Sequence, residues 1–172
     1  LNKALARHGL FFTPEPGANA TIGGMIANNA AGIKTIKYGA TKDNVLKLEV
    51  VLASGDVIQV GTRARKDSAG YDLVHLFVGS EGTLGIITEA ILRLIPMPAP
   101  KLTMLAFFRT VREAGKAVAL MTRTLRPATL ELMDGPTIQA VDAALRLGLD
   151  PDAGAMLMIE SDAGGQAAET EM

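Results

Sequence analysis

The sequence predicts an α+β protein made of two units that meet near residues 96–100. In the first part of the 172-residue chain, apolar side chains alternate with polar ones, as they do in half-buried β-strands. The second part alternates strand-like and helix-like segments in the order β-α-β-α-β. Between them, Pro96-Met-Pro-Ala-Pro100 is typical of a linker, because alternate prolines hold the chain extended and remove backbone donors. We therefore expect domains over residues 1–98 and 99–172.

The first unit begins with short elements that have clear end signals. Residues 1–8 are expected to form a helix that Gly9 stops. Residues 44–60 predict a β-hairpin, because apolar and polar residues alternate before the turn Ser54-Gly55-Asp56 and the largely apolar segment 57–60 returns after it.

The rest of the first unit predicts a short helix and a long strand. Asp72 is placed to cap the helix, and Gly79 to end it. The apolar face of this helix is expected to consist of Leu73, Leu76 and Phe77. The strand is expected over residues 86–95, with one face formed by Ile86, Ala90, Leu92 and Leu94.

The second unit predicts three strands and two helices. The strands are expected at residues 102–108, 130–133 and 156–159, followed by a polar tail. Thr110 and Glu113 have the spacing of a capping box, which opens a helix running to about Leu125. Asp134 with Pro136 begins the second helix, and Gly148 closes it.

Composition excludes several classes of function. The net charge is −1, which provides no electrostatic footprint for nucleic acid or an anionic membrane. There is no cysteine, so disulfides, thiolate zinc sites and cysteine nucleophiles are excluded together. The apolar runs are too short to form a transmembrane segment, and no signal peptide is visible. We expect a cytoplasmic protein.

The usual catalytic motifs are missing. The two histidines, His8 and His75, lack metal-ligand spacing, and His75 is expected to face solvent. No serine lies in a G-x-S-x-G elbow, and neither a Walker phosphate loop nor a G-x-G-x-x-G turn is present. The sequence predicts no metal site.

Two glycine-rich segments remain, and each allows two interpretations. In "TIGGMIANNAAG", residues 21–32, Thr21 can cap a helix that Gly32 terminates, with Ile22, Met25, Ile26 and Ala30 on one face. The opposite face is small, so it can pack against a neighbouring element or leave the helix start open to a polar ligand. In "GSEGTLGIIT", residues 79–88, the glycines can serve strand entry or a close backbone approach to a ligand.

The order of four segments carries a family resemblance. "PEPGANATIGGMIANNAAG", "KYG", "VLKLEVVLASGDV" and "GYDLVHLFVGSEGTLGIITEAILRLIPMP" follow one another along the chain. Together they resemble the FAD-binding domain of FAD-linked oxidases with the vanillyl-alcohol-oxidase fold, in the branch of D-lactate dehydrogenase and the glycolate oxidase D subunit. Residues 101–172, with "PATLELMD", look like the start of the family's substrate-side domain. The resemblance thus implies the later half of a vanillyl-alcohol-oxidase-type FAD-binding domain, followed by an α+β, ferredoxin-like cap.

The resemblance also implies the cofactor, FAD, and the residues that contact it, largely through main-chain atoms. Gly82 and Gly85 would allow the backbone to approach the planar flavin. The implied contact residues are Pro16, Gly17, Ala18, Asn19, Ala20, Thr21, Gly23, Gly24, Asn28, Asn29, Ala30, Ala31, Glu81, Gly82, Thr83, Leu84, Gly85, Ile86 and Ile87.

Two parts of the family pattern have no counterpart in the chain. These are a glycine-rich pyrophosphate loop, expected before Leu1, and a histidine-rich active-site segment, expected beyond Met172. We therefore expect the chain to be the middle of an enzyme, inactive by itself, whose catalytic residues cannot be assigned.

By resemblance, the enzyme oxidises a 2-hydroxy acid such as D-lactate or glycolate by hydride transfer to flavin N5. One alternative keeps the fold and changes the reaction to phenol oxidation or ether-lipid synthesis. Another is a flavin-free remnant that acts as a binding or assembly module. The expected partner is the small-molecule substrate, with a homo-oligomer or electron-transfer subunits left open.

Overall fold

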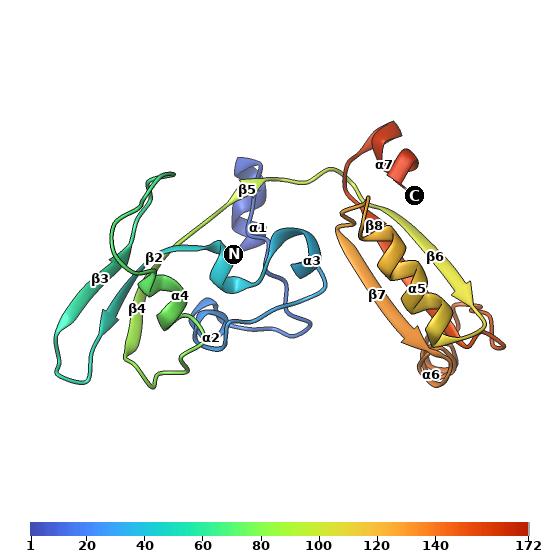
Figure 1. Cartoon of the computed structure of the whole chain (residues 1–172), viewed down its shortest axis with the longest axis horizontal. Helices are drawn as coiled ribbons and strands as arrows, with labels where there is room; N and C mark the ends of the chain where they lie inside the picture. The colour runs from blue at the N-terminus through green and yellow to red at the C-terminus, as the bar shows by residue number, and fades with distance from the viewer. Residues whose placement is uncertain (172) are drawn as a thin grey trace. The chain divides into compact units, whose positions relative to one another are not determined.

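The computed structural model describes residues 1–171, which fold into two compact units (Figure 1). The units are Leu1–Met97 and Pro98–Met172, and each is described by itself. Both combine helices with antiparallel sheets, so the predicted α+β class is confirmed. No helix in the described part of the chain is long and apolar enough to cross a membrane.

The first unit is organised around a three-stranded sheet of order β3-β2-β4. Its strands are β2 (Val45–Val51), β3 (Val57–Gly61) and β4 (Ile86–Leu92), and β2–β3 is the predicted hairpin. The helices α2 (Ile22–Asn28) and α4 (Leu73–Phe77) pack against one face. The buried core of this unit consists of Ile26, Val45, Leu48, Val50, Val60, Val74, Phe77 and Val78.

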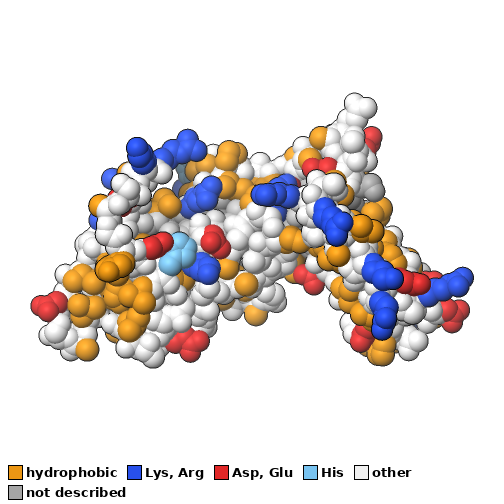
Figure 2. Space-filling view, viewed as in Figure 1, with side chains coloured by type: hydrophobic (Ala, Val, Ile, Leu, Met, Phe, Trp, Pro, Cys, Tyr) orange, Lys and Arg blue, Asp and Glu red, His pale blue; other side chains and the backbone are white. Residues whose placement is uncertain are grey.

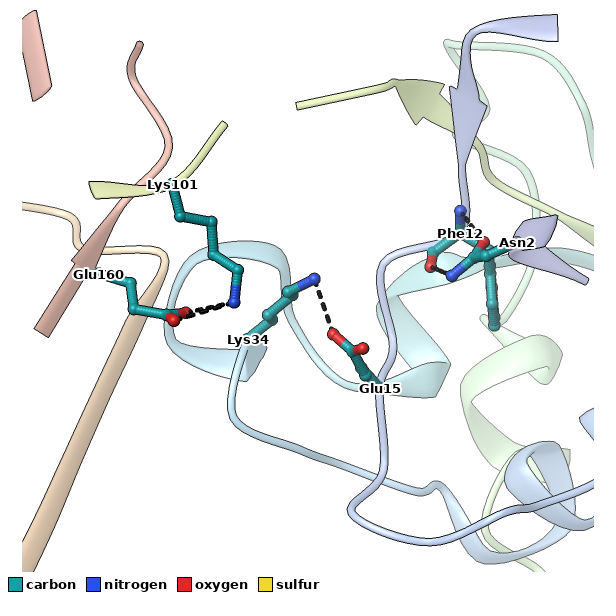
Figure 3. A network of polar contacts seen from close by, with 6 residues as sticks. All are labelled: Asn2, Phe12, Glu15, Lys34, Lys101 and Glu160. Carbon is teal, nitrogen blue, oxygen red and sulfur yellow. Dashed lines mark hydrogen bonds and ion pairs between the residues drawn. The ribbon is translucent and has the colours of Figure 1, made fainter. Parts of the chain in front are cut away.

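Shorter elements complete the first unit. They are α1 (Asn2–Leu5), η1 (Ala6–His8), β1 (Leu10–Phe11), α3 (Thr35–Tyr38), η2 (Thr41–Asn44) and β5 (Ile95–Pro96). Gly9 follows η1 in the left-handed conformation, with φ 65°, as the predicted helix stop requires. The side-chain amide of Asn2 forms two hydrogen bonds with the backbone of Phe12, of 3.0 and 2.9 Å, and so ties α1 to the segment after β1 (Figure 3).

The predicted strand over residues 86–95 is wrong in two respects. It ends at Leu92, and Ile95–Pro96 pairs instead with β1 in a separate sheet. Along β4, Glu49 pairs with Glu89 but Val50 pairs with Ile87, so Thr88 is an extra, bulged residue. The bulge shifts the alternation by one position, which places Ile87 with Ala90 and Leu92 against the core and leaves Ile86 62% exposed.

The predicted apolar face of α4 is also partly wrong. Asp72 caps the helix as expected, since its Oδ1 accepts the N–H of His75 at 3.0 Å. The core side, however, is formed by Val74 and Phe77, which are 6% exposed, whereas Leu73 and Leu76 are exposed. The helix has only five residues, so its contacts with β2 and β3 determine which side faces inward.

The second unit contains a sheet of order β6-β8-β7, in which β8 pairs antiparallel with both neighbours. The strands are β6 (Leu102–Phe108), β7 (Thr129–Asp134) and β8 (Ala155–Ser161), alternating with α5 (Val111–Met121) and α6 (Gly135–Leu145). The predicted β-α-β-α-β order is therefore confirmed. Apolar residues of α5 pack on the face of β8 formed by Ala155, Leu157 and Ile159.

The caps of the second unit are as predicted, but two helix ends differ and one helix was not predicted. Thr110 and Glu113 form the capping box, with bonds of 3.2 Å in both directions. The helix α5 ends at Met121 rather than Leu125, and α6 ends at Leu145, because Arg146 turns left-handed with φ 53°. The polar tail forms a further helix, α7 (Gly165–Glu171). Lys101 pairs with the buried Glu160 of β8 at 2.9 Å (Figure 3).

Candidate functional site

The two glycine-rich segments, far apart in the sequence, lie against each other in the first unit. The loop that precedes β4 docks on the C-terminal end of α2 through two backbone hydrogen bonds. Gly79 N–H donates to the Ile26 carbonyl at 3.0 Å, and Glu81 N–H donates to the Ala27 carbonyl at 3.1 Å. The structure thus brings together the implied contact residues of α2 and those of the 81–87 loop.

The helix α2 begins as predicted and ends earlier. The Thr21 hydroxyl accepts the Gly24 N–H at 3.0 Å, and the core side contains the buried Met25 and Ile26. The helix stops at Asn29, which adopts the left-handed conformation with φ 50°, and not at Gly32. Gly32 has another role: a side chain there would collide with the carbonyl group of Glu15.

This close contact at Gly32 places the segment 16–21 beside the turn after α2. A shallow hollow of about 440 Å³ follows this segment, lined by Glu15, Pro16, Gly17, Ala18, Asn19 and Ile33. Lys34 holds Glu15 by an ion pair of 2.7 Å (Figure 3). The Lys34 Nζ also lies 4.5 Å from the centroid of the Phe11 ring. The base of the segment is therefore anchored, while residues 17–21 remain exposed.

Neither packing nor backbone conformation within the chain requires glycine at positions 17 and 23. A Cβ at either position would meet nothing within 4 Å, and neither residue has positive φ. Glycine within a helix costs roughly 0.5–1 kcal/mol relative to alanine, so Gly23 is unfavourable for α2 itself. The chain thus leaves side-chain-free surface open at both segments, as a ligand lying close to the backbone would require.

Gly82 and Gly85 have reasons within the chain. Gly82 has φ +79°, a conformation that favours glycine. A Cβ at Gly85 would lie 2.7 Å from Cγ1 of Val50 and 2.8 Å from the carbonyl oxygen of Val51. Close packing against β2 is therefore enough to explain why residue 85 is glycine. This supports the strand-entry interpretation and does not require a cofactor.

The loop between α4 and β4 also contains strain and an unsatisfied polar atom. Glu81 has φ 52°, and a non-glycine residue in this region costs roughly 1–2 kcal/mol. The hydroxyl oxygen of Ser80 is buried and has no hydrogen-bond partner among residues 1–171. Such features concentrate at ligand sites. Ser80 was not among the implied contacts, since a serine between two loop residues has no distinctive pattern in sequence.

An apolar surface adjoins this loop. Leu84 is 44% exposed and Ile86 62% exposed. Val51 pairs with Ile86 on one side and with Val57, which is 59% exposed, on the other. Figure 2 shows hydrophobic side chains gathered over the part of the first unit that contains the sheet. Such a surface can cover a planar apolar ring and exclude water from it.

Each implied contact residue lies at the surface or is half-buried, and within the described residues none is fully buried. The exposed ones are Gly17, Ala18, Asn19, Ala20, Thr21, Gly23, Asn28, Ala31, Glu81, Gly82, Thr83, Leu84 and Ile86. The half-buried ones are Pro16, Gly24, Asn29, Ala30, Gly85 and Ile87. They form open surface rather than core.

The histidine and carboxylate groups lie outside these segments. His75 faces solvent as predicted, and its Nδ1 lies 2.6 Å from Oδ2 of Asp72. Hydrogen bonding from the His75 backbone, with further contributions from its ring, lowers the pKa of Asp72. This pair lines a separate hollow of about 400 Å³ between the 67–72 loop and the hairpin. Among residues 1–171, no group of His, Asp and Glu is arranged to hold a metal ion.

Comparison with known families assigns both units. A family model described as "FAD binding domain" matches residues 1–61, and one described as "FAD linked oxidases, C-terminal domain" matches residues 97–172. A glycolate oxidase subunit GlcD of Bacillus subtilis is 45% identical over 99% of this chain and 37% of its own length. A D-lactate dehydrogenase of Archaeoglobus fulgidus is 46% identical over 81% of this chain and 32% of its own length.

Solved structures agree on the fold. Alkyldihydroxyacetonephosphate synthase matches with a TM-score of 0.78 and 23% identity, over 99% of this chain and 34% of its own. This likeness confirms the predicted vanillyl-alcohol-oxidase-type fold and says nothing of the reaction. The chain spans about a third of the length of the relatives it matches. With matches to the FAD-binding domain and to the C-terminal domain, and relatives named for glycolate and D-lactate, the chain belongs to the FAD-linked oxidases.

Proposed function

We propose that the chain forms part of the FAD site and part of the substrate-side domain of an enzyme that oxidises a 2-hydroxy acid of the D-lactate or glycolate type. The names of the relatives support this class of substrate, since they are a glycolate oxidase subunit and D-lactate dehydrogenases. The observation that carries the proposal is the docking of the 79–81 loop on α2, together with the surface left open at Gly17 and Gly23.

The residues proposed to hold FAD belong to three segments: Pro16–Thr21; Gly23, Gly24 and Asn28–Ala31 in and after α2; and Glu81–Ile87. Their fit to the cofactor rests on the open positions at Gly17 and Gly23 and on the unsatisfied Ser80 hydroxyl. Backbone groups suit a polar, planar ligand here, because no side chain at either glycine stands between ligand and main chain.

The chemistry proposed for bound FAD is acceptance of a hydride from the α-carbon of the substrate. The contribution of this chain is binding and orientation. The exposed apolar side chains of Leu84 and Ile86 would cover a ring and remove it from water. Main-chain groups of the 16–21 and 28–31 segments would take the polar parts of the ligand.

The alternatives from the sequence are weaker. The likeness to alkyldihydroxyacetonephosphate synthase is only 23% identical, so ether-lipid synthesis has no support beyond the shared fold. The relatives named for glycolate or D-lactate are 37–46% identical. The open glycine at position 23 favours a ligand that lies close to the backbone over a flavin-free binding module.

The proposal includes partners and location. The small-molecule 2-hydroxy acid is the substrate. The relatives named as glycolate oxidase subunits support a partner subunit rather than a lone chain, and electron transfer is the role we propose for that partner. A homo-oligomer and a cytoplasmic location stay predictions.

The test uses the full-length protein. Purified protein is expected to show absorbance bands in the near-ultraviolet and blue, which a bound flavin produces. Under anaerobic conditions, D-lactate or glycolate should bleach the blue band, whereas L-lactate serves as the stereochemical control. Protein without flavin bands, or a band bleached by a phenol and by neither hydroxy acid, would overturn the proposal.

A further inference from the structure

Three polar side chains lie in the interior of the first unit where apolar ones would be expected. Thr13 is 1% exposed, Thr41 0% and Asn44 3%. Burying polar groups is unfavourable unless each has a hydrogen-bond partner. Their partners therefore indicate what these residues are for.

Both the nitrogen and the oxygen of the Asn44 side-chain amide form hydrogen bonds. Its Nδ2 donates to the carbonyl oxygens of Tyr38 at 3.0 Å and Ala40 at 2.9 Å. Its Oδ1 accepts the hydroxyl of Thr13 at 3.0 Å. Its own carbonyl accepts the N–H of Arg93 at 2.8 Å. Asn44 thus joins the segment after β1, the turn after α3 and the end of β4.

The same turn is bound to the end of α2. The carbonyl of Ala30 accepts two bonds from Thr41, from its N–H at 3.1 Å and its hydroxyl at 2.7 Å. Lys42 N–H donates to Oδ1 of Asn29 at 3.0 Å. The turn 38–44 therefore holds both the segment that leads into residues 16–21 and the segment 28–31.

We propose that Asn44 is a positioning residue for the cofactor: it holds two FAD-binding segments in the arrangement that binds. The inference rests on the proposed function, because the two segments are the ones assigned there to FAD. Asn44 is itself buried, so it acts through Thr13, Tyr38 and Ala40 and not by touching the ligand. Affinity for a ligand falls in proportion to the fraction of molecules in the binding-competent arrangement.

The test measures the FAD dissociation constant of the full-length apo-protein by flavin fluorescence, for Asn44→Ala and Thr13→Val. Each change leaves a buried group without its partner, and roughly tenfold weaker binding is expected from that penalty. Thr13→Val keeps the side-chain shape and remains informative if Asn44→Ala fails to fold. Thr13→Ser retains the hydroxyl and should restore wild-type affinity.

Val60→Ala is the control for stability alone. Val60 is 6% exposed in β3 and takes no part in this network, so the change removes core packing and leaves the hydrogen bonds intact. At an equal fall in melting temperature, Val60→Ala should retain FAD affinity and the visible circular dichroism of bound flavin, whereas Thr13→Val should lose both.

Equal effects in Val60→Ala and Thr13→Val would overturn the positioning role, as would unchanged affinity in Thr13→Val. If either result were found while the wild-type protein binds FAD tightly, only the positioning role would be overturned and the proposed function would be retained. A wild-type protein that binds no FAD would overturn both.

Discussion

Two glycines of the candidate site should respond to alanine in opposite ways. At Gly85 a Cβ would lie 2.7 Å from Cγ1 of Val50 and 2.8 Å from the Val51 carbonyl oxygen. Both distances are shorter than real Cβ contacts, and the second involves backbone, so the strand must shift. Overpacking of this kind costs roughly 1–3 kcal/mol. We therefore expect Gly85→Ala to destabilise the apo-protein.

At Gly23 the same change meets open space. Nothing lies within 4 Å of a Cβ there, and alanine is preferred to glycine in a helix by up to about 1 kcal/mol. Gly23→Ala should therefore leave the apo-protein unchanged or more stable, while it places a methyl group on the surface proposed to receive FAD. The expected result is weaker FAD binding with no loss of apo stability.

The assay is a melting temperature of the full-length apo-protein, paired with FAD affinity, for both variants and the wild type. A stability change of 1 kcal/mol shifts the melting temperature of a domain by roughly 2–8 °C, which is readily measured. A Gly85→Ala apo-protein as stable as wild type would refute the packing argument. Undiminished FAD affinity in Gly23→Ala would refute the assignment of the open face of α2 to the cofactor.

Three further results are expected. Limited proteolysis should cut first at residues 96–100, and cleavage scattered through residues 44–60 instead would contradict two independently folded units. Thr110→Ala removes the cap of α5, whose Glu113 N–H bond is 3.2 Å, and should cost the second unit about 1 kcal/mol in urea denaturation, whereas Thr110→Ser should not. The pKa of Asp72 lies below its ordinary value of 3.8, so the small stability gained from this exposed carboxylate is present above that pH and lost as pH falls below it. In Asp72→Ala the urea midpoint should fall less steeply with acid than in the wild type; an unchanged acid profile would refute the role of the Asp72–His75 contact.

Features that depend on neighbours in sequence were predicted correctly. The hairpin at Val45–Gly61 follows from period-two alternation before a turn and a largely apolar segment after it. The caps at Thr21, Asp72 and Thr110 follow from a side-chain oxygen placed three residues before a free N–H. The family resemblance is of the same kind, since it rests on ordered motifs along the chain. Physical chemistry within one turn or one strand is enough for all of these.

Tertiary contacts decided the rest, because partners distant in sequence leave no local pattern. The bulge at Thr88 exists only in the pairing of β4 with β2, and it reverses which side chains face the core. Gly85 is glycine because of Val50 and Val51, which lie more than thirty positions earlier. Asn44 belongs to no sequence motif that would single it out. Its hydrogen bond to Thr13, 31 positions away, nevertheless makes it the junction of the proposed cofactor segments. The role of a buried polar side chain depends on its hydrogen-bond partners, and only folding brings those partners to it.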